Sequence, residues 1–238
     1  MKLPRFLQIK RKYAKPEIKT HTPEPIGNKV ARSPSGKGTY RTRFQIGKKK
    51  HTWFMRNILS QEQLEMIQKL RKLGVNAEKP VFEKTIGGNI TVFYEHGETL
   101  HTVLKKLVDK KKKTQWKIVK KLALRQLAKE LAKMHCEGIE HGHPHSHNLT
   151  WKRFRIGLID FSKAIQRQIN WSDANSTYSS FRDDYHYLGS RVLKFEFGMK
   201  LKEVREFFQK VVNNYPCTEQ VKQKILEQIT EDFQRAKY

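Results

Sequence analysis

Four histidines alternate along one short segment, and imidazole is a side chain that can bind metals and move protons. The segment runs His141-Gly-His-Pro-His-Ser-His-Asn148, so every second residue from 141 to 147 is a histidine. On an extended loop alternate side chains point the same way, so these rings could converge on a transition metal. Zinc usually takes four ligands, and Cys136 or Asp160 could provide one. One hypothesis is therefore a metal site on this loop.

Proton transfer is a second chemistry open to the same segment. An imidazole with the ordinary pKa near 6.5 can act as a base at neutral pH, and His143 stands five residues before Asn148. Asp160 follows soon after, at the end of Arg155-Ile-Gly-Leu-Ile, which has the apolar texture of a buried strand. The plainer interpretation is an asparagine turn and an aspartate that caps a strand end.

The elements before this segment predict a small antiparallel sheet with one helix. Alternating side chains indicate strands at 40–46 and 51–56, and two shorter strands at 81–85 and 89–94. Between the two pairs, Ser60 is expected to cap a helix over 61–73 that Gly74 ends. Its apolar stripe is Leu64, Ile67, Leu70 and Leu73.

The remainder of the chain is predicted to be mainly helical. Amphipathic spacing predicts helices over 99–110, with Thr99 as a cap, and over 114–136, which Gly138 ends. Short strands at 149–151 and 155–160 follow the histidine segment. Further helices are expected over 183–197, 201–213 and 218–237.

This order of a helix, a loop ending in Asn, a hairpin and an Ile-Asp-Phe turn resembles the catalytic loop and metal-binding turn of protein-kinase-like phosphotransferases. It looks closest to small atypical branches. These are the RIO-type kinases, the kinase partner of the tRNA threonylcarbamoylation complex, lipopolysaccharide core kinases, UbiB-like proteins and aminoglycoside phosphotransferases. The resemblance covers about residues 33–200.

The resemblance implies an α+β fold, the bilobal protein-kinase-like fold, with a small antiparallel β N-lobe plus one helix and a mainly helical C-lobe. Residues 33–94 would form the N-lobe, 95–98 the hinge and 99–238 the C-lobe. Residues 1–32, rich in proline and lysine, are expected to form an irregular basic arm.

The resemblance also implies a catalytic set of His143, Asn148 and Asp160. Asn148 and Asp160 would bind Mg²⁺ or Mn²⁺, since hard oxygen ligands suit these ions. The family pattern has an aspartate where His143 stands, so either a histidine acts as the base or the fold transfers phosphate poorly or not at all. His141 would pack under the Phe161 turn.

Three further positions support this loop in the resemblance. His145 matches the Pro-His variant of the lipopolysaccharide-kinase and UbiB-like branches. Asp184, or Asp183, would hold the loop by hydrogen bonds to its backbone; a surface helix cap is the alternative.

ATP would bind between the lobes. Gly36 and Gly38 would let the backbone approach the phosphates. Arg56 would pair with phosphate and with Glu65, or else with Glu62. The adenine would lie against Val92 and the backbone of Phe93, Tyr94 and Glu95; an edge strand is the alternative interpretation.

The charge of the chain constrains its partners. Of 238 residues, 49 are Lys or Arg and 23 are Asp or Glu, a net charge of +26. Sixteen of the basic residues lie in the first 56 positions, and a second concentration covers 105–133. A polyanion is the expected partner: RNA, a ribonucleoprotein, an anionic substrate or an anionic membrane face. A solvated basic surface is the plainer interpretation.

Other classes are excluded or unsupported. No apolar run reaches the ~20 residues that span a bilayer, and the N-terminus lacks the pattern of a secretory signal. Two cysteines are too few for a disulfide framework. A reducing, cytoplasmic location is expected.

Three functional hypotheses remain. The first is an atypical ATP-dependent kinase that phosphorylates a hydroxyl of a protein or anionic substrate, with His143 in place of the usual Asp. The second is a catalytically inactive kinase-like scaffold that binds RNA or a ribonucleoprotein. The third is a lipopolysaccharide-type sugar kinase at a membrane surface.

Overall fold

The computed structural model describes residues 31–32, 38–46, 49–59, 61–86, 89–95 and 98–235. In the strands up to Leu59 and from Lys79 to Glu95, the description is of the backbone. Gly36, Ser60 and most of the predicted arm over 1–32 lie outside the described residues.

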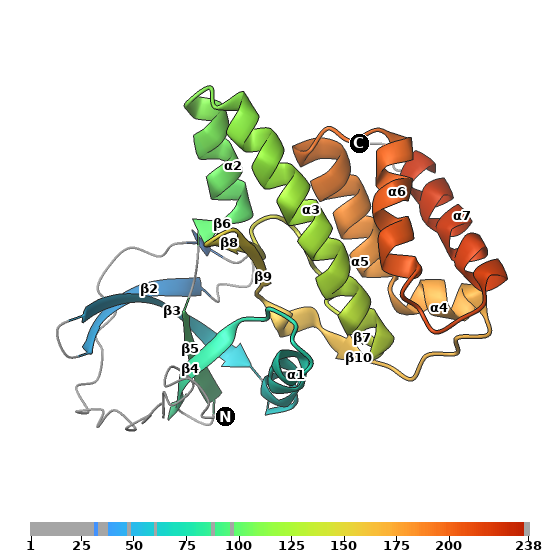
Figure 1. The fold of residues 1–238 in the computed structure, drawn as a ribbon. Coiled ribbons are helices and arrows are strands. Elements are labelled where there is room, and N and C mark those ends of the chain that lie inside the picture. The colour runs from blue at the N-terminus through green and yellow to red at the C-terminus, as the bar shows by residue number, and fades with distance from the viewer. Residues whose placement is uncertain are drawn as a thin grey trace, which may run out of the picture.

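The first part of the chain forms one antiparallel sheet with the strand order β1-β2-β3-β5-β4. The predicted strand pairs are confirmed, and each is longer than the alternation indicates. Figure 1 shows this sheet on one side of the molecule, with the large helices on the other. The strands are Ala31–Arg32 (β1), Gly38–Ile46 (β2), Lys49–Leu59 (β3), Lys79–Ile86 (β4) and Asn89–Glu95 (β5).

Helix α1, Gln61–Lys72, lies between β3 and β4 in the chain. Its stripe of Leu64, Ile67 and Leu70 is buried. Leu73, predicted to complete the stripe, is 41% exposed because the helix ends at Lys72, one residue before it. Gly74 follows with a φ of +75°, a left-handed conformation that glycine adopts without strain.

Seven helical segments of five or more residues lie in the described second part. The cap at Thr99 is confirmed, since its side chain accepts a hydrogen bond from the backbone N–H of Thr102. The segments are Leu100–Asp109 (α2), Lys113–Cys136 (α3), Ala174–Ser180 (α4), Arg182–His186 (α5), the π-helix Tyr187–Glu196 (η3), Leu201–Val212 (α6) and Glu219–Arg235 (α7).

Two differences from the predicted helices have physical reasons. The predicted helix over 183–197 is α5 followed by the π-helical η3, because apolar spacing does not distinguish these hydrogen-bond patterns. Helix α4 is not predicted, since its sequence, Ala-Asn-Ser-Thr-Tyr-Ser-Ser, has no apolar period. Its start depends on Asp173, whose side chain accepts from the N–H groups of Asn175 and Ser176.

Two small sheets and one short turn position the histidine segment. One sheet has the order β6-β8-β9, and the other pairs β7 with β10, both antiparallel. Figure 1 shows them between the large sheet and the helices. The elements are Glu98–Thr99 (β6), Ile139–Glu140 (β7), Leu149–Lys152 (β8), Arg155–Leu158 (β9), the 3-10 turn Phe161–Lys163 (η2) and Ile165–Gln166 (β10).

The core is built mainly by α3, α6, η3 and α7 around buried Leu127, Leu131, Phe181 and Phe208. The segment between α1 and β4 joins this body: the Leu158 N–H donates to the Asn76 carbonyl at 2.9 Å, and the Glu78 N–H donates to the Leu158 carbonyl at 2.7 Å. Within the described part of the chain, no helix combines the length and apolar character that crossing a bilayer requires.

Candidate active site

The histidine segment is a loop between β7 and β8, and both of its ends are fixed. At its start, Ile139 and Glu140 pair with Gln166 and Ile165 of β10. At its end, β8 pairs with β9 in a tight hairpin. Two glycines allow the chain to turn here: Gly138 and Gly142 have φ of +70° and +77°. An added Cβ on Gly142 would lie 2.6 Å from the Lys163 carbonyl oxygen, so the loop packs directly on the chain just after Asp160.

Asp184 holds this loop from the opposite side. It is fully buried, and its carboxylate accepts hydrogen bonds from the backbone N–H of His141 at 2.9 Å and of Gly142 at 2.7 Å. The prediction for Asp184 is therefore confirmed. Asp183, the other candidate, is exposed. A carboxylate that accepts two or more N–H bonds fixes the backbone at this point.

A chain of buried polar groups extends from Asp184 into the core. His135 Nε2 lies 2.9 Å from Asp184 Oδ2, and His135 Nδ1 lies 2.5 Å from the Tyr215 hydroxyl. The Tyr215 hydroxyl lies 2.7 Å from that of Tyr185. Burial raises the pKa of both tyrosines well above 10, so both hydroxyls keep their protons. Tyr185 can then donate to Tyr215, Tyr215 to Nδ1, and Nε2–H to the carboxylate.

The backbone of Asn148 lies beside the residue that precedes Asp160, because the Ile159 N–H donates to the Asn148 carbonyl at 2.9 Å. The buried Asn148 side chain donates through Nδ2 to the His143 carbonyl at 3.0 Å, which leaves its amide oxygen to act as a ligand. Asp160 has a left-handed backbone (φ 69°, ψ 61°), and its Oδ1 accepts from the Ser162 hydroxyl at 2.5 Å. An amide oxygen and a carboxylate are the hard ligands that Mg²⁺ or Mn²⁺ prefers, so the donor set fits such an ion.

His143 is half-buried at the middle of the loop. Its ring packs edge-on against Tyr187 and His145, with centroids 4.5 and 4.3 Å away. Burial, followed by the positive charge of Lys163, lowers the pKa of His143 to about 4. Its ring is therefore neutral at pH 7 and can accept a hydrogen bond from a hydroxyl, but it is a weaker base than an ordinary histidine.

The rings of His143, His145 and His147 are neighbours, but the zinc hypothesis is wrong for the described residues. No group of three or more His, Cys, Asp or Glu side chains there could hold a metal ion. His141 turns inward instead: it is buried, lies 3.0 Å from the Ile159 carbonyl through Nε2, and packs on Phe161 as predicted. Cys136 donates to the Asn214 carbonyl rather than facing the loop.

The rings of His145 and His147 lie edge to face with centroids 5.7 Å apart, and the His147 N–H donates to His145 Nδ1 at 3.2 Å. His147 stacks on His101 of α2 with centroids 4.2 Å apart. Burial lowers the pKa of His145 to about 3 and also lowers that of His147. Ser146 between them donates to Glu196 at 2.6 Å, which ties the loop to η3.

The residues predicted to bind ATP lie on neighbouring strands. Arg56 of β3 is opposite Val92 of β5, and Trp53, Phe54 and Met55 are opposite Glu95, Tyr94 and Phe93. Gly38 opens β2. The predicted Arg56 ion pair stays a prediction, as does the role of Gly36 outside the described residues.

Both candidate acidic partners, Glu62 and Glu65, are exposed on α1. They line a pocket of about 660 Å³ between α1 and the segment after Asp160, which includes Ile165 and Gln166. The Gln63 side chain joins the two walls by donating to the Ser162 carbonyl at 2.8 Å. Helix α1 thus contacts the turn that presents Asp160.

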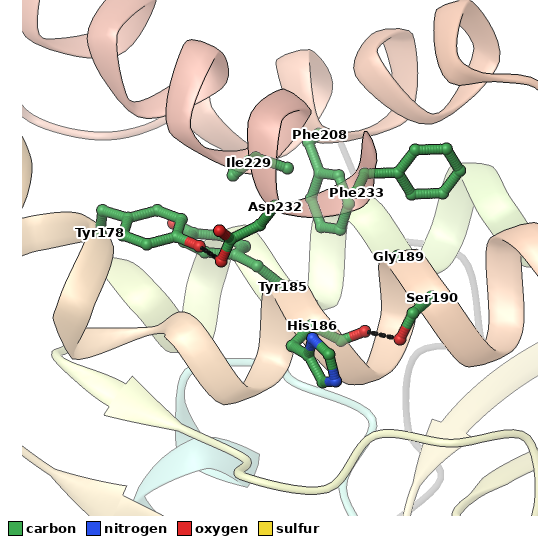
Figure 2. A pocket seen from close by; sticks show the side chains of 9 residues that line it. All are labelled: Tyr178, Tyr185, His186, Gly189, Ser190, Phe208, Ile229, Asp232 and Phe233. Atoms are coloured by element: carbon green, nitrogen blue, oxygen red, sulfur yellow. Dashed lines mark hydrogen bonds between the residues drawn. The ribbon is translucent and has the colours of Figure 1, made fainter. Parts of the chain in front are cut away.

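A second, much smaller pocket lies under α7 (Figure 2). It is lined by the hydrogen-bonded pair Tyr178 and Asp232, with Tyr185 and Phe208 beside them. Its volume of about 10 Å³ has room for no more than a water molecule, so it is a packing defect and not a ligand site.

No pattern in the sequence identified His135, Tyr185 or Tyr215 as part of the site. The only hint in the sequence was a histidine, His135, in the apolar stripe of a predicted helix. A histidine at such a position is equally typical of an ordinary core residue. The effect of Lys163 and Arg191, which lower the pKa of His143, was not predicted because both residues are distant in the chain from His143.

Comparison with known proteins agrees with this fold. A solved structure of WaaP in complex with acyl carrier protein matches with a TM-score of 0.50 and 15% sequence identity, over 87% of this chain and 89% of that chain. This likeness shows the kinase-like fold, as predicted. No curated protein is similar enough in sequence to count as a match.

The sequence profile of the lipopolysaccharide kinase (Kdo/WaaP) family matches residues 35–178, more than half of the chain. The match includes β2 to β10, the histidine loop and the turn at Asp160. The chain belongs to the lipopolysaccharide kinase (Kdo/WaaP) family, a branch of the protein-kinase-like superfamily, whose members use ATP.

Proposed function

We propose that this protein is an ATP-dependent kinase that phosphorylates a sugar hydroxyl of a lipopolysaccharide-type glycolipid. The main support is that the family match spans the loop held by Asp184 and the Asp160 turn. The family favours this glycolipid hypothesis over the first hypothesis of the sequence analysis, a kinase for a protein or another anionic substrate.

In this proposal Asn148 and Asp160 hold Mg²⁺ or Mn²⁺ through their side-chain oxygens. The bound ion would neutralise negative charge on the phosphates during transfer. Residues 33–94 and 99–238 act as two lobes joined by the hinge at 95–98. ATP lies between them, with Gly36, Gly38 and Arg56 at its phosphates, Val92 to Glu95 at its adenine, and Glu65 as the ion-pair partner of Arg56.

His143 accepts a hydrogen bond from the acceptor hydroxyl and orients it. Phosphoryl transfer passes through a loose transition state, so positioning contributes more than removal of the proton before attack. A neutral imidazole can position a hydroxyl even though burial makes it a poor base. We expect a rate below that of a site with a carboxylate here.

The low pKa of His143 also favours a second candidate, the inactive kinase-like scaffold. A ring with a pKa of about 4 gives little driving force for proton transfer at pH 7. In that case nucleotide binding survives and transfer stays at background.

The test is transfer of labelled γ-phosphate from ATP to lipopolysaccharide whose core phosphates have been removed. We expect magnesium-dependent labelling that D160N reduces at least ~100-fold, since charge neutralisation by the bound ion is lost. The matched control is D173N, the same chemical change at a helix cap where asparagine serves as well as aspartate. Labelling that D160N leaves unchanged contradicts the metal assignment.

Thermal unfolding separates binding from transfer. ATP with Mg²⁺ should raise the midpoint, because a ligand that binds only the folded state stabilises it. H143A should keep this shift and lose transfer. A shift without any transfer by the unmodified protein supports the scaffold, and the absence of a shift contradicts both candidates.

A further inference from the structure

Helices α2 and α3 form a hairpin whose tip is strongly basic. Residues 105–121 contain nine lysines and one acidic residue, Asp109. Four of the lysines, Lys110–Lys113, form the turn and the first residue of α3; we call them the tip lysines. Figure 1 shows this tip projecting beyond the small sheets and away from the rest of the molecule.

The tip lysines are exposed, and none forms an ion pair with another described residue. Two neighbours differ in this respect. Lys106 pairs with Glu98, and Lys120 donates to the Phe197 carbonyl at 2.7 Å and lies over the Trp116 ring. Lys106 and Lys120, which lie nearer the body of the protein, therefore have partners within it, whereas the charges of the tip lysines face solvent.

Apolar side chains are exposed among these lysines. Val108 on α2 is 62% exposed and Ile118 on α3 is 51% exposed, and each lies within about two helical turns of the tip. Among the described residues, six large hydrophobic side chains are at least 41% exposed. Two of the six lie on this hairpin. Aliphatic groups beside lysines are typical of surfaces that enter a lipid headgroup layer.

The backbone of the tip is also unusual. Lys111 has a φ of +53°, a left-handed conformation in which glycine or asparagine is expected. This turn ends α2, since the N–H groups of Lys111 and Lys112 donate to the Val108 and Leu107 carbonyls at 2.8 Å.

We propose that the α2–α3 hairpin docks the protein on an anionic lipid bilayer, with the tip lysines at the headgroups and Val108 and Ile118 inserted between them. The positive tip complements the negative surface of such a membrane. Single-stranded RNA is a weaker fit, because RNA-binding surfaces stack bases on exposed aromatic rings. The one aromatic residue of this part of the hairpin, Trp116, is half-buried against Phe197.

Docking by the tip would also set the distance between the candidate site and the lipid surface. Helix α2 has ten residues and so rises about 15 Å from its start to the tip. His101, at its start, stacks on His147 of the histidine loop. The loop would then lie at most about that far above the lipid surface. The inference itself goes beyond the proposed function, because lipid binding does not require phosphate transfer.

The first test measures binding of the full chain to phosphatidylcholine vesicles with and without phosphatidylglycerol, by cosedimentation. The hairpin variant is K110Q/K111Q/K112Q/K113Q. The matched control, K202Q/R205Q/K210Q/K224Q, removes the same charge from exposed positions on α6 and α7. We expect the hairpin variant to bind anionic vesicles at least tenfold more weakly, since each lysine near the surface contributes roughly a factor of five. Equal losses in the two variants would overturn the proposal.

The second test locates the contact. A nitrobenzoxadiazole probe is attached at I118C, or at R205C as the control, in a C136S/C217S background. With anionic vesicles the probe at 118 should shift to the blue and the probe at 205 should not. The same response at both positions contradicts docking by the hairpin. A hairpin variant that loses affinity for an RNA oligonucleotide but keeps its affinity for vesicles would assign the tip to RNA and also refute the proposal.

Discussion

At the scale of single residues, Asp184 connects the candidate catalytic loop to the protein core. Its carboxylate accepts two backbone bonds from the loop and one from His135, and all of these groups are buried. A buried donor without an acceptor costs about 1–3 kcal/mol. The position of His143 therefore depends on a residue more than forty positions later.

Replacing this carboxylate should destabilise the protein strongly. In D184A three buried donors lose their acceptor, so we expect the free energy of unfolding to fall by roughly 3–5 kcal/mol. Urea titration measures this change. The control is D183A at the adjacent exposed position, which should cost less than about 0.5 kcal/mol. Similar losses in the two variants would show that Asp184 does not have this role.

At the scale of elements, the histidine loop should make the protein sensitive to acid. Burial is the largest cause that lowers the pKa of His143 to about 4 and of His145 to about 3. The unfolded chain titrates these groups near 6.5, so it binds more protons than the folded chain between about 6.5 and 3. Their contribution to stability is fully present above pH 6.5 and is lost as the pH falls through this window.

The variant H145Q tests this contribution. It has one fewer titrating group, so its free energy of unfolding should fall less steeply from pH 7 to pH 4 than that of the unmodified protein. Urea titrations at several pH values measure the slope. H186Q, a change at an exposed histidine on α5, is the control. An H145Q slope as steep as that of the unmodified protein would mean that the loop is not the source of acid sensitivity.

The close approach of the loop to the chain after Asp160 gives a second prediction at this scale. G142A places a methyl group 2.6 Å from the Lys163 carbonyl oxygen in a left-handed backbone, so we expect a loss of about 2–4 kcal/mol. G198A has a similar φ of +58° but no atom within 4 Å. It should cost only about 1 kcal/mol by the same denaturation measurement. Equal costs would mean that the loop can move away from Lys163.

At the scale of the whole molecule, net charge opposes the compact state. A charge of +26 repels itself, and salt shortens the range of this repulsion. We expect the thermal midpoint to rise by several degrees between ~0.05 and ~0.3 M NaCl. The variant K202Q/R205Q/K210Q/K224Q, with four fewer charges, should show a smaller rise. A midpoint that falls with salt would show that ion pairs outweigh the repulsion.

Much of the fold could be predicted because its signals are local. The spacing of Leu64, Ile67 and Leu70 predicts the length of α1 to within one residue, and Gly74 and Gly138 mark helix ends where the φ is left-handed. Helix α4 and the two-residue strands β7 and β10 could not be predicted. A seven-residue polar helix has no apolar period, and the pairing of β7 with β10 joins segments 26 residues apart.

The candidate site, like the fold, could be predicted only in part. The order of His143, Asn148 and Asp160 is visible in the sequence, and the resemblance assigned them their roles. The packing around these residues could not be read from the sequence. His141 turns inward, and the described residues hold no metal-binding group of the kind that the zinc hypothesis requires. Leu73, expected in the apolar stripe of α1, lies exposed just beyond the helix.

The amphipathic helices, the basic character and the order of the site residues could be read from the amino-acid sequence, because each depends on neighbours a few residues away or on composition alone. The folded structure was needed to show which histidine faces the core, how Asp184 holds the loop and how far the pKa values of His143 and His145 fall. Desolvation and buried hydrogen bonds depend on which distant segments meet, and His135, Asp184 and Tyr215 meet only in the folded chain.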